Sequence, residues 1–525
     1  MDGAGDYRDE LVSHCCWMKC MIAPSSSSLN KTEAREHGAG VDGRSLLSGG
    51  DYGDKRLQPL CTGKGGQMIW RLLMLLSMVA IVCGDEPKCY DFGCVFSNYP
   101  YFSLTRPSIP AQSPESINTQ FLLLTVNNTD SYQVISARNL SSIRHSNFNC
   151  SRDTVFIVHG YIETGRDAWL LTMCQSLLAV VNINCICVDW SGGSSAIYLQ
   201  AINNVQVAGG EIGYFINIIK DNFNCSLSRM ILIGHSLGGL VVAEAGKRRP
   251  RIAVIIVLDP ARPLFQGQPK EVTIDAGDAN FVMAVHTDTG TVGLGIQTLV
   301  GHVDFFPNGG KQMPGCDGSQ ILDFDLTKGL LIATRDAVLC NHVFSYKVSI
   351  AAILNPDGFM GYCADDEDSF KKGAGFPCQN DTCSLMSYFN KRRNTTSCRK
   401  YYLITGPRGD YARWRYNATV QTQGNAVTLG SIQVTLYNSS NVSHEHTIYT
   451  GTVAGGATYS AFIDVRFPPP IARITVTLPL LSSLLNQNLS VNLMVLIFGN
   501  TGSQYNFCGN ETTKYGGTQT LRPCK

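Results

Sequence analysis

Residues 229–246 read RMILIGHSLGGLVVAEAG, and this stretch indicates how the longer part of the chain folds. An apolar run leads directly into the motif GHSLG, which places Ser236 between Gly234 and Gly238, and a segment with helical periodicity follows. Such a sharp strand-to-helix turn brings backbone atoms so close together that only glycine fits beside the serine, whose hydroxyl is left exposed. The stretch therefore predicts a strand, an elbow and a helix, with Ser236 placed to act as a nucleophile.

Three other near-continuous apolar runs flank this unit, at residues 154–160, 183–190 and 252–260. Runs of this kind are typical of parallel strands that helices bury on both faces. Helix-like segments lie between the runs, at 167–181 and 206–223. The alternation predicts an α/β fold with a doubly wound, mostly parallel sheet, in which functional groups gather at the carboxyl ends of the strands.

A different pattern begins at residue 411, where short runs of alternating apolar residues are separated by turn residues and show little helical period. Such runs predict an all-β antiparallel sandwich. They occupy residues 413–424, 431–438, 446–453, 460–467, 472–479 and 489–499. The stretch GPRGD at 406–410 is the expected linker. The predicted domains are therefore 85–405 for the α/β domain and 411–525 for the β domain.

The composition indicates an exported protein with disulfide bonds. The 525 residues include 20 cysteines, too many for an ordinary cytosolic enzyme, and a net charge of +1 gives no reason to expect a nucleic acid as partner. Residues 68–84 combine an arginine, an uncharged apolar run and a small-residue end, as in a secretory signal peptide; a core helix or a signal anchor is the alternative. Residues 1–67 are an upstream segment with no clear role. Eleven Asn-x-Ser/Thr sites follow the predicted signal, which fits a secreted, extracellular glycoprotein.

A serine hydroxyl becomes a good nucleophile only when a histidine takes its proton and a carboxylate orients that histidine. In this fold class the acid follows the serine along the chain, and the histidine follows the acid. Asp259 ends the next apolar run after the serine, at the edge of the sheet where a triad acid would lie. His286, His302 and His342 come later in this domain, and chain order alone does not choose among them.

The oxyanion hole of such a site needs two backbone N–H groups. One is expected from Leu237, directly after the nucleophile, and the other from Tyr161, in the loop after the apolar run 154–160. His159 and His235, beside these turns, are interpreted as structural residues. The predicted chemistry is acyl transfer through a serine ester.

With these residues in place, the chain resembles the pancreatic lipase family over residues 86–525. The resemblance is carried by stretches that occur in the family's order: HGYIETGRDAWL, NCICVDW, GHSLGG, LDPARPLFQG, AVHTD, GHVDFFPNGG, KQMPGC, TRDAVLCNHVFSYK and ARWRY. It implies an α/β-hydrolase domain followed by a PLAT β-sandwich domain. On the matching positions, Ser236 is the nucleophile, Asp259 the acid and His342 the base. Tyr161 and Leu237 match the oxyanion-hole positions.

The resemblance also implies five disulfide bonds and a lid. The disulfides are Cys89–Cys94, Cys174–Cys185, Cys316–Cys340, Cys378–Cys383 and Cys508–Cys524. The lid would lie between Cys316 and Cys340, where residues 321–336 alternate apolar and acidic groups. Such a segment can cover a site in water and turn its apolar face to lipid.

After these pairs, five other cysteines remain downstream of the predicted signal peptide. Cys150 and Cys225 each come shortly before a predicted strand, and because those strands should be neighbours we expect a disulfide between them. Cys363 lacks its usual family partner, and Cys398 is the candidate replacement. Cys187 is then left as a free buried thiol.

The family holds a structural calcium ion just beyond the catalytic acid, through carboxylates and backbone carbonyls. Asp275 and Asp278 are retained in this chain, whereas Lys270 stands where a glutamate is expected and Glu271 follows one residue along. Asp275, Asp278 and Glu271 are therefore the candidate calcium ligands. The ester chemistry itself requires no cofactor.

These inferences predict a secreted triacylglycerol lipase that acts at a lipid–water interface. Its expected partners are the surface of a lipid droplet or micelle and a colipase-like protein docked on the PLAT domain. Ala261 and Pro263, just after the acid, match the active members of the family. Two alternatives stay open: a phospholipase A1 or galactolipase of similar chemistry, and a non-catalytic lipid-binding protein on the same fold.

Overall fold

The computed structural model describes residues 86–316, 330–379, 382–390, 398–480, 487–509 and 517–524. For residues 330–338 it describes the backbone only. The predicted signal peptide and upstream segment lie outside the described residues, as does the lid up to residue 329. None of the helices that are described combines the length and the apolar character that a membrane span requires.

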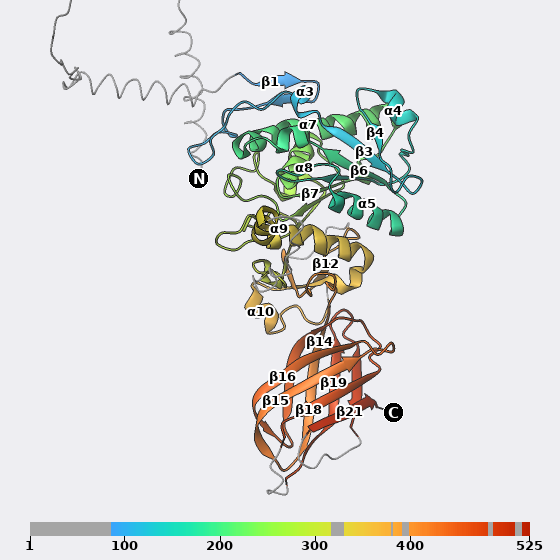
Figure 1. Ribbon diagram of the computed structural model, residues 1–525, viewed down its shortest axis with the longest axis vertical. Helices are drawn as coiled ribbons and strands as arrows, with labels where there is room; N and C mark the ends of the chain where they lie inside the picture. The colour runs from blue at the N-terminus through green and yellow to red at the C-terminus, as the bar shows by residue number, and fades with distance from the viewer. Residues whose placement is uncertain are drawn as a thin grey trace, which may run out of the picture. The chain divides into compact units, whose positions relative to one another are not determined.

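The α/β domain is built on one eleven-stranded sheet (Figure 1). Its spatial order is β12-β11-β13-β10-β9-β8-β7-β5-β6-β3-β4. The central strands from β13 to β6 run parallel, and the pairs at both edges are antiparallel. The strands are β3 (Gln120–Leu124), β4 (Gln133–Ile135), β5 (Thr154–Val158), β6 (Asn184–Asp189), β7 (Met230–His235), β8 (Val254–Leu258), β9 (Phe281–Val285), β10 (Val303–Pro307), β11 (Met360–Cys363), β12 (Cys383–Leu385) and β13 (Lys400–Leu403).

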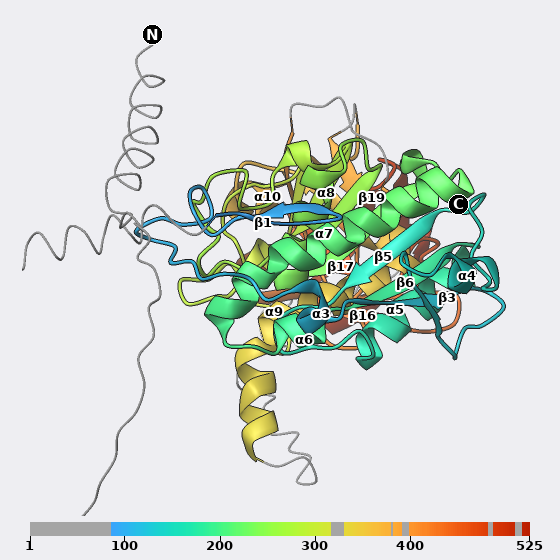
Figure 2. The ribbon, with the colours of Figure 1, turned by 90° about the horizontal axis from the view of Figure 1, so that it is seen from above.

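Helices cover this sheet on both faces, as the continuous apolar strands require. On one face α7 (Tyr198–Phe223) and α8 (Leu237–Arg248) pack against the inward residues of the strands, and Figure 2 shows α7 crossing the domain. On the other face α5 (Ala168–Val180) and α9 (Leu330–Leu354) form a second core. The shorter elements are β1 (Lys88–Tyr90), β2 (Gly93–Val95), α3 (Pro114–Ile117), α4 (Leu140–Arg144), α6 (Ser191–Ser194) and α10 (Glu367–Lys371).

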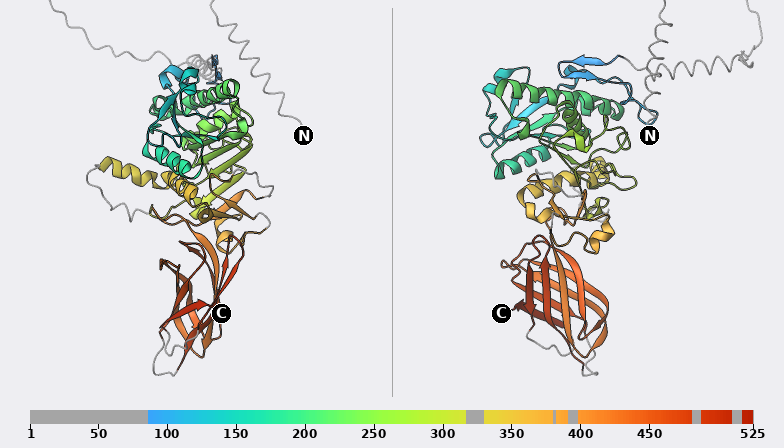
Figure 3. Two further views of the ribbon diagram at one scale, coloured as in Figure 1. Left: turned by 90° about the vertical axis from the view of Figure 1, so that its right-hand side faces the viewer. Right: turned by 180° about the vertical axis from the view of Figure 1, so that it is seen from behind.

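The C-terminal domain is an antiparallel sheet of eight strands, in the order β16-β15-β18-β21-β20-β19-β14-β17, and Figure 3 shows its strands in two layers. Its core consists of the alternate apolar residues of these strands, such as Val420, Val434 and Leu496. The strands are β14 (Trp414–Gly424), β15 (Val427–Tyr437), β16 (Ser443–Ala454), β17 (Thr458–Val465), β18 (Arg473–Leu478), β19 (Leu489–Phe498), β20 (Gln504–Cys508) and β21 (Gly517–Pro523). The last two were not predicted from the sequence, because neither carries a run of alternating apolar residues.

One buried arginine connects the two domains. Arg415, at the start of β14, is 4% exposed and donates to the carboxylate of Asp464 (2.8 Å) and to the main-chain carbonyl of Phe370 in α10 (3.2 Å). Its guanidinium also lies 4.0 Å from the centre of the Phe370 ring. Since Phe370 belongs to the first domain and Asp464 to the second, these contacts span the junction.

The structure joins all five disulfide pairs that the family resemblance implies. It also joins Cys150 to Cys225, whose Cα atoms lie 4.8 Å apart, and Cys363 to Cys398. The first of these follows from topology, because β5 and β7 are adjacent parallel strands with Thr154 beside Met230. Cys187 in β6 is a buried free thiol, and burial raises the pKa of this thiol to about 12.

Candidate active site

Ser236 occupies the turn between β7 and α8, as the motif predicts. Its φ of 55° lies in a region that residues other than glycine rarely adopt. The two flanking glycines make this turn feasible. A Cβ added to Gly234 would lie 2.2 Å from the carbonyl oxygen of Gly238, and one added to Gly238 would lie 2.3 Å from the carbonyl oxygen of Val158 in β5. Close backbone approach therefore fixes both glycines, and the strained turn presents the serine at the carboxyl edge of the sheet.

Asp259 lies at the same edge, directly after β8, and is fully buried. Its Oδ1 accepts hydrogen bonds from the backbone N–H groups of Thr287 (2.8 Å) and Asp288 (3.1 Å). Its Oδ2 lies 2.6 Å from Nδ1 of His342, a residue of α9. Four lone-pair positions on a buried carboxylate are costly to leave empty, so these contacts both hold the carboxylate and direct it at one histidine.

The geometry separates the three histidines that chain order leaves equivalent. Of these three histidines, His342 is the one whose ring forms a hydrogen bond with Asp259. His286 in the loop after β9 is fully buried, and its two ring nitrogens lie 2.8 Å from Asp304 and 2.9 Å from the carbonyl oxygen of Ile296. Burial opposes protonation of this imidazole, yet the Asp304 carboxylate raises the pKa of His286. His302 accepts a hydrogen bond from the N–H of Val282. His286 therefore holds the loop beside the site, whereas His302 lies at the amino ends of β9 and β10, on the opposite edge of the sheet.

The two expected oxyanion donors both lie beside Ser236. Leu237 is the first residue of α8, where the N–H groups of the first turn have no partner within the helix and the helix dipole is positive. Tyr161 follows Gly160, whose backbone touches the serine so closely that an added Cβ would lie 2.9 Å from the Cβ of Ser236. The Tyr161 ring packs edge-on against Tyr198 at 5.1 Å. A carbonyl carbon at Ser236 would therefore have its oxygen between two backbone loops.

Of the three candidate calcium ligands, the structure brings Asp275 and Asp278 together but leaves Glu271 apart. In the part of the chain that the structure describes, the only group of three potential ligands close enough to share a metal consists of Asp259, Asp288 and His342, at the triad itself. Near Asp278 a cation is already present, because Nζ of Lys247 donates to both of its carboxylate oxygens at 2.6 Å and lies 3.8 Å from Asp275. The residues as folded thus fit an ammonium group better than a calcium ion.

The hydrogen bonds of the loop 275–278 explain why its carboxylates do not fit a calcium ion. Asp275 and Asp278 cap one short 3-10 helix reciprocally, which uses a carboxylate oxygen of each. Burial raises the pKa of the Asp278 carboxyl to about 7, and the ammonium of Lys247 opposes this shift. The side chain of Glu271 lies on the surface, and its main-chain carbonyl accepts from Tyr101.

Lys247→Met is expected to destabilise the fold by about 3–5 kcal/mol, because it leaves Asp278 buried without its partner. Thermal unfolding of the purified protein measures this. The matched control is Lys220→Met, whose exposed ion pair with Asp221 should contribute less than about 1 kcal/mol. Chelation with EDTA should leave the Tm of the unaltered protein unchanged. A fall in Tm on chelation that calcium restores would show that Lys247 is not the resident cation.

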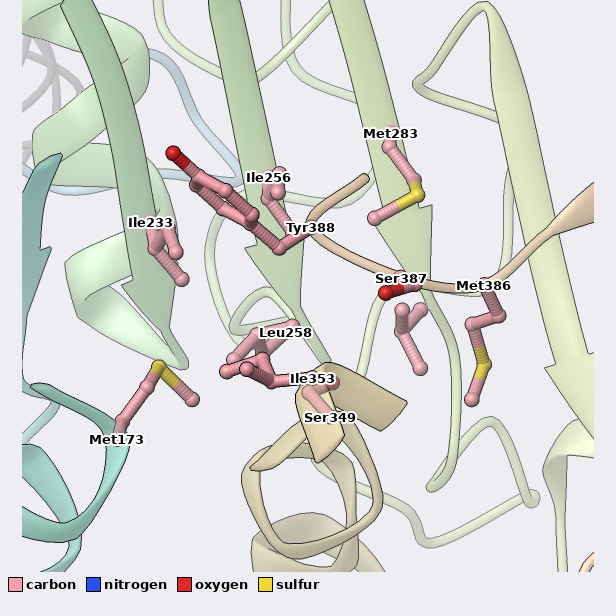
Figure 4. A pocket seen from close by; sticks show the side chains of 11 residues that line it. Met173, Ile233, Ile256, Leu258, Met283, Ser349, Ile353, Met386, Ser387 and Tyr388 are labelled. Carbon is pink, nitrogen blue, oxygen red and sulfur yellow. The ribbon is translucent and has the colours of Figure 1, made fainter. Parts of the chain in front are cut away.

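A small apolar cavity lies behind the triad, between the sheet and α9 (Figure 4). Its walls include Leu258, which precedes Asp259, and three methionines, Met173, Met283 and Met386. The free space is about 20 Å³, enough for one water molecule. A cavity of this size cannot accept an acyl chain, so it is not the substrate site.

Comparison with known proteins gives a consistent result. Residues 88–411 match the family described as Lipase. The chain is 39% identical to the pancreatic triacylglycerol lipase of Myocastor coypus over 471 residues, which cover 85% of this chain and 100% of that protein. It is 39% identical to the pancreatic triacylglycerol lipase of Homo sapiens, covering 87% and 99%. It is also 40% identical to the inactive pancreatic lipase-related protein 1 of Mus musculus, covering 87% and 98%.

Proposed function

Since the chain belongs to the lipase family, we propose that it is a secreted serine lipase that hydrolyses the ester bonds of triacylglycerols at a lipid–water interface. The observation that carries the proposal is that Ser236, on a strained elbow, lies at the same edge of the sheet as the buried pair of His342 and Asp259. His235, directly before Ser236, packs against the ring of His342. This combination of serine, histidine and aspartate is what acyl transfer by a serine requires.

The chemistry follows from the placement of these groups. His342 takes the proton of the Ser236 hydroxyl while the serine oxygen attacks the ester carbonyl carbon, and Asp259 stabilises the imidazolium that results. The N–H groups of Leu237 and Tyr161 donate to the oxyanion of the tetrahedral intermediate. The intermediate collapses as His342 returns the proton to the departing alcohol, which leaves an acyl ester on the serine. A water molecule, deprotonated by His342, then attacks this ester. As the second tetrahedral intermediate collapses, His342 returns the proton to Ser236 and the fatty acid is released.

One relative named above is described as inactive, so family membership alone does not establish activity. Ala261 and Pro263 support an active chain, because both match the pattern of the active members. They lie in the loop after Asp259, where Ala261 is buried and its N–H donates to the carbonyl oxygen of Ser236. The loop that carries the acid is thus joined by a hydrogen bond to the main chain of the nucleophile.

Secretion forms part of the proposal. Seven disulfides join described residues, which is typical of extracellular proteins and rare in the cytosol. The sequence at 68–84 supplies the signal peptide that export needs. In the extracellular space we expect the triacylglycerol substrate to lie at the surface of a lipid droplet or micelle.

The lid and the C-terminal domain would provide contact with that surface. The disulfide Cys316–Cys340 closes the base of the lid, and α9 leads from the lid directly to His342. In the C-terminal domain the apolar segment 476–485 is a candidate lipid contact. Val476 and Leu478 are buried in β18, whereas Leu480 is 80% exposed. The rest of the candidate, residues 481–485, lies outside the described residues. A colipase-like protein docked on this domain is the other expected partner.

Assays of the purified protein on triolein and on phosphatidylcholine, each with and without added colipase, test the proposal. We expect fatty acid release from triolein to exceed that from phosphatidylcholine. Activity on phospholipid or galactolipid alone would instead identify a phospholipase A1 or galactolipase. No hydrolysis of any of these esters would identify a lipid-binding protein without catalysis.

A further inference from the structure

Glu163 is a buried acidic residue beside the site that the mechanism above does not use. It lies in the loop after β5, two residues beyond Tyr161, and only 11% of its side chain is exposed. Its Oε2 accepts a hydrogen bond from the backbone N–H of Gly160 at 2.7 Å and lies 3.4 Å from Nδ1 of His235. One carboxylate oxygen thus touches both the loop of one oxyanion donor and the residue that precedes Ser236.

The loop that Glu163 holds is strained. Ile162 has a φ of 56°, in the left-handed region that a β-branched residue almost never adopts, and more than half of its side chain is exposed. Strain of this kind persists only where the surroundings impose it. Two contacts with Ser194 impose it from one side, through the N–H of Ile162 and the main-chain carbonyl of Glu163. The carboxylate of Glu163 imposes it from the other.

The neighbours of Glu163 favour the ionised form of its carboxyl group. Burial alone would raise the pKa of this carboxyl, but His235, the Gly160 N–H and His159 together lower it to about 2. A buried carboxylate of this kind costs several kcal/mol unless it is paired, so it is not placed there by chance packing. On its other side His235 packs against the ring of His342, with 4.7 Å between ring centroids.

We propose that Glu163 is a positioning residue for the ester hydrolysis proposed above. Its carboxylate ties the loop 160–163 to the strand end that precedes Ser236, and so aims the Tyr161 N–H at the oxyanion. It also orients the His235 ring against which His342 rests. Glu163 itself does not touch the substrate; it acts through Gly160 and His235. This inference deepens the proposed function and rests on it.

The experiment compares two variants with a control from the same loop. Glu163→Gln keeps the side-chain shape and one acceptor oxygen but removes the charge, whereas Glu163→Ala removes both. Asp167→Asn is the control, because the carboxylate of Asp167 accepts hydrogen bonds from Thr164 and not from Gly160 or His235. The substrate is a soluble short-chain p-nitrophenyl ester, so that contact with a lipid surface does not enter. Active sites are counted by titration with a p-nitrophenyl phosphonate, and kcat is given per titrated site.

We expect kcat per site to fall about 10-fold in Glu163→Gln and about 100-fold in Glu163→Ala, with KM within about twofold, since small misplacements of a donor cost this much. The control should stay within about twofold of the unaltered protein. Unchanged kcat per site in both variants would overturn the proposal. So would a loss of titratable sites and of Tm without a change in kcat per site, because this indicates a purely structural role. Inactivity of the unaltered protein on every ester would instead defeat the proposed function.

Discussion

Ser236→Ala is expected to lower kcat for ester hydrolysis by about 10⁵–10⁶-fold, because no other group can form the acyl ester. The fold should survive, since the side chain adds only a hydroxyl to a turn that the flanking glycines and the backbone of β5 already define. Fatty acid release from emulsified tributyrin, followed by alkali titration at constant pH, measures the loss.

The control for this substitution is Ser228→Ala, an exposed serine in the segment that leads into β7. It should keep full activity. If Ser236→Ala kept more than about a hundredth of the activity, another group would have to be the nucleophile.

Asp259→Asn is expected to lower kcat by about 10⁴-fold while leaving the fold intact. The amide oxygen can still accept from the N–H groups of Thr287 and Asp288, which secures the loop. The amide nitrogen, however, would face Nδ1 of His342 as a donor and force the wrong tautomer on the imidazole. It would also fail to stabilise the imidazolium during the reaction. Steady-state kinetics on a soluble ester, with Tm as the measure of folding, separates these effects.

Two further variants sharpen this result. Asp221→Asn, at an exposed surface pair, should leave kcat unchanged. Asp288→Asn is the stricter comparison, because Asp288 lies next to Asp259 and His342 and its Oδ2 accepts from the N–H of Leu294. A 10⁴-fold loss in Asp288→Asn, together with an active Asp259→Asn, would move the role of the acid to Asp288.

The central strands could be predicted from the sequence because their burial on both faces leaves an unbroken apolar signal. Four predicted runs correspond to β5, β6, β7 and β8, with differences of at most two residues at each end; they are 154–160, 183–190, 229–236 and 252–260. The beginning of α7 was predicted too late. The helix starts at Tyr198, but its first turns bury the amides of Asn203 and Asn204, which interrupt the apolar period. The Asn204 amide is satisfied by Gly193 and Gln112, and the Asn203 amide oxygen accepts from Ser108. No local pattern reveals these partners.

The site was predictable only in part, for a related reason. The elbow is local, so Ser236 and Leu237 follow from one motif. The choice among the histidines depends on where α9 and the loop after β9 return to the sheet, which chain order does not give. The contacts of Lys247 with Asp278 and of Glu163 with His235 join residues 31 and 72 positions apart. A pairing of this kind becomes visible only in three dimensions.

Covalent labelling of the active serine tests directly whether Ser236 is the nucleophile. The purified protein is treated with diethyl p-nitrophenyl phosphate, digested, and mapped by mass spectrometry, while residual hydrolysis is measured in parallel. We expect one residue, Ser236, to carry the diethyl phosphate group, and activity to fall in proportion to its occupancy. An adduct at a different residue, or full hydrolysis with Ser236 completely modified, would contradict this assignment of the nucleophile.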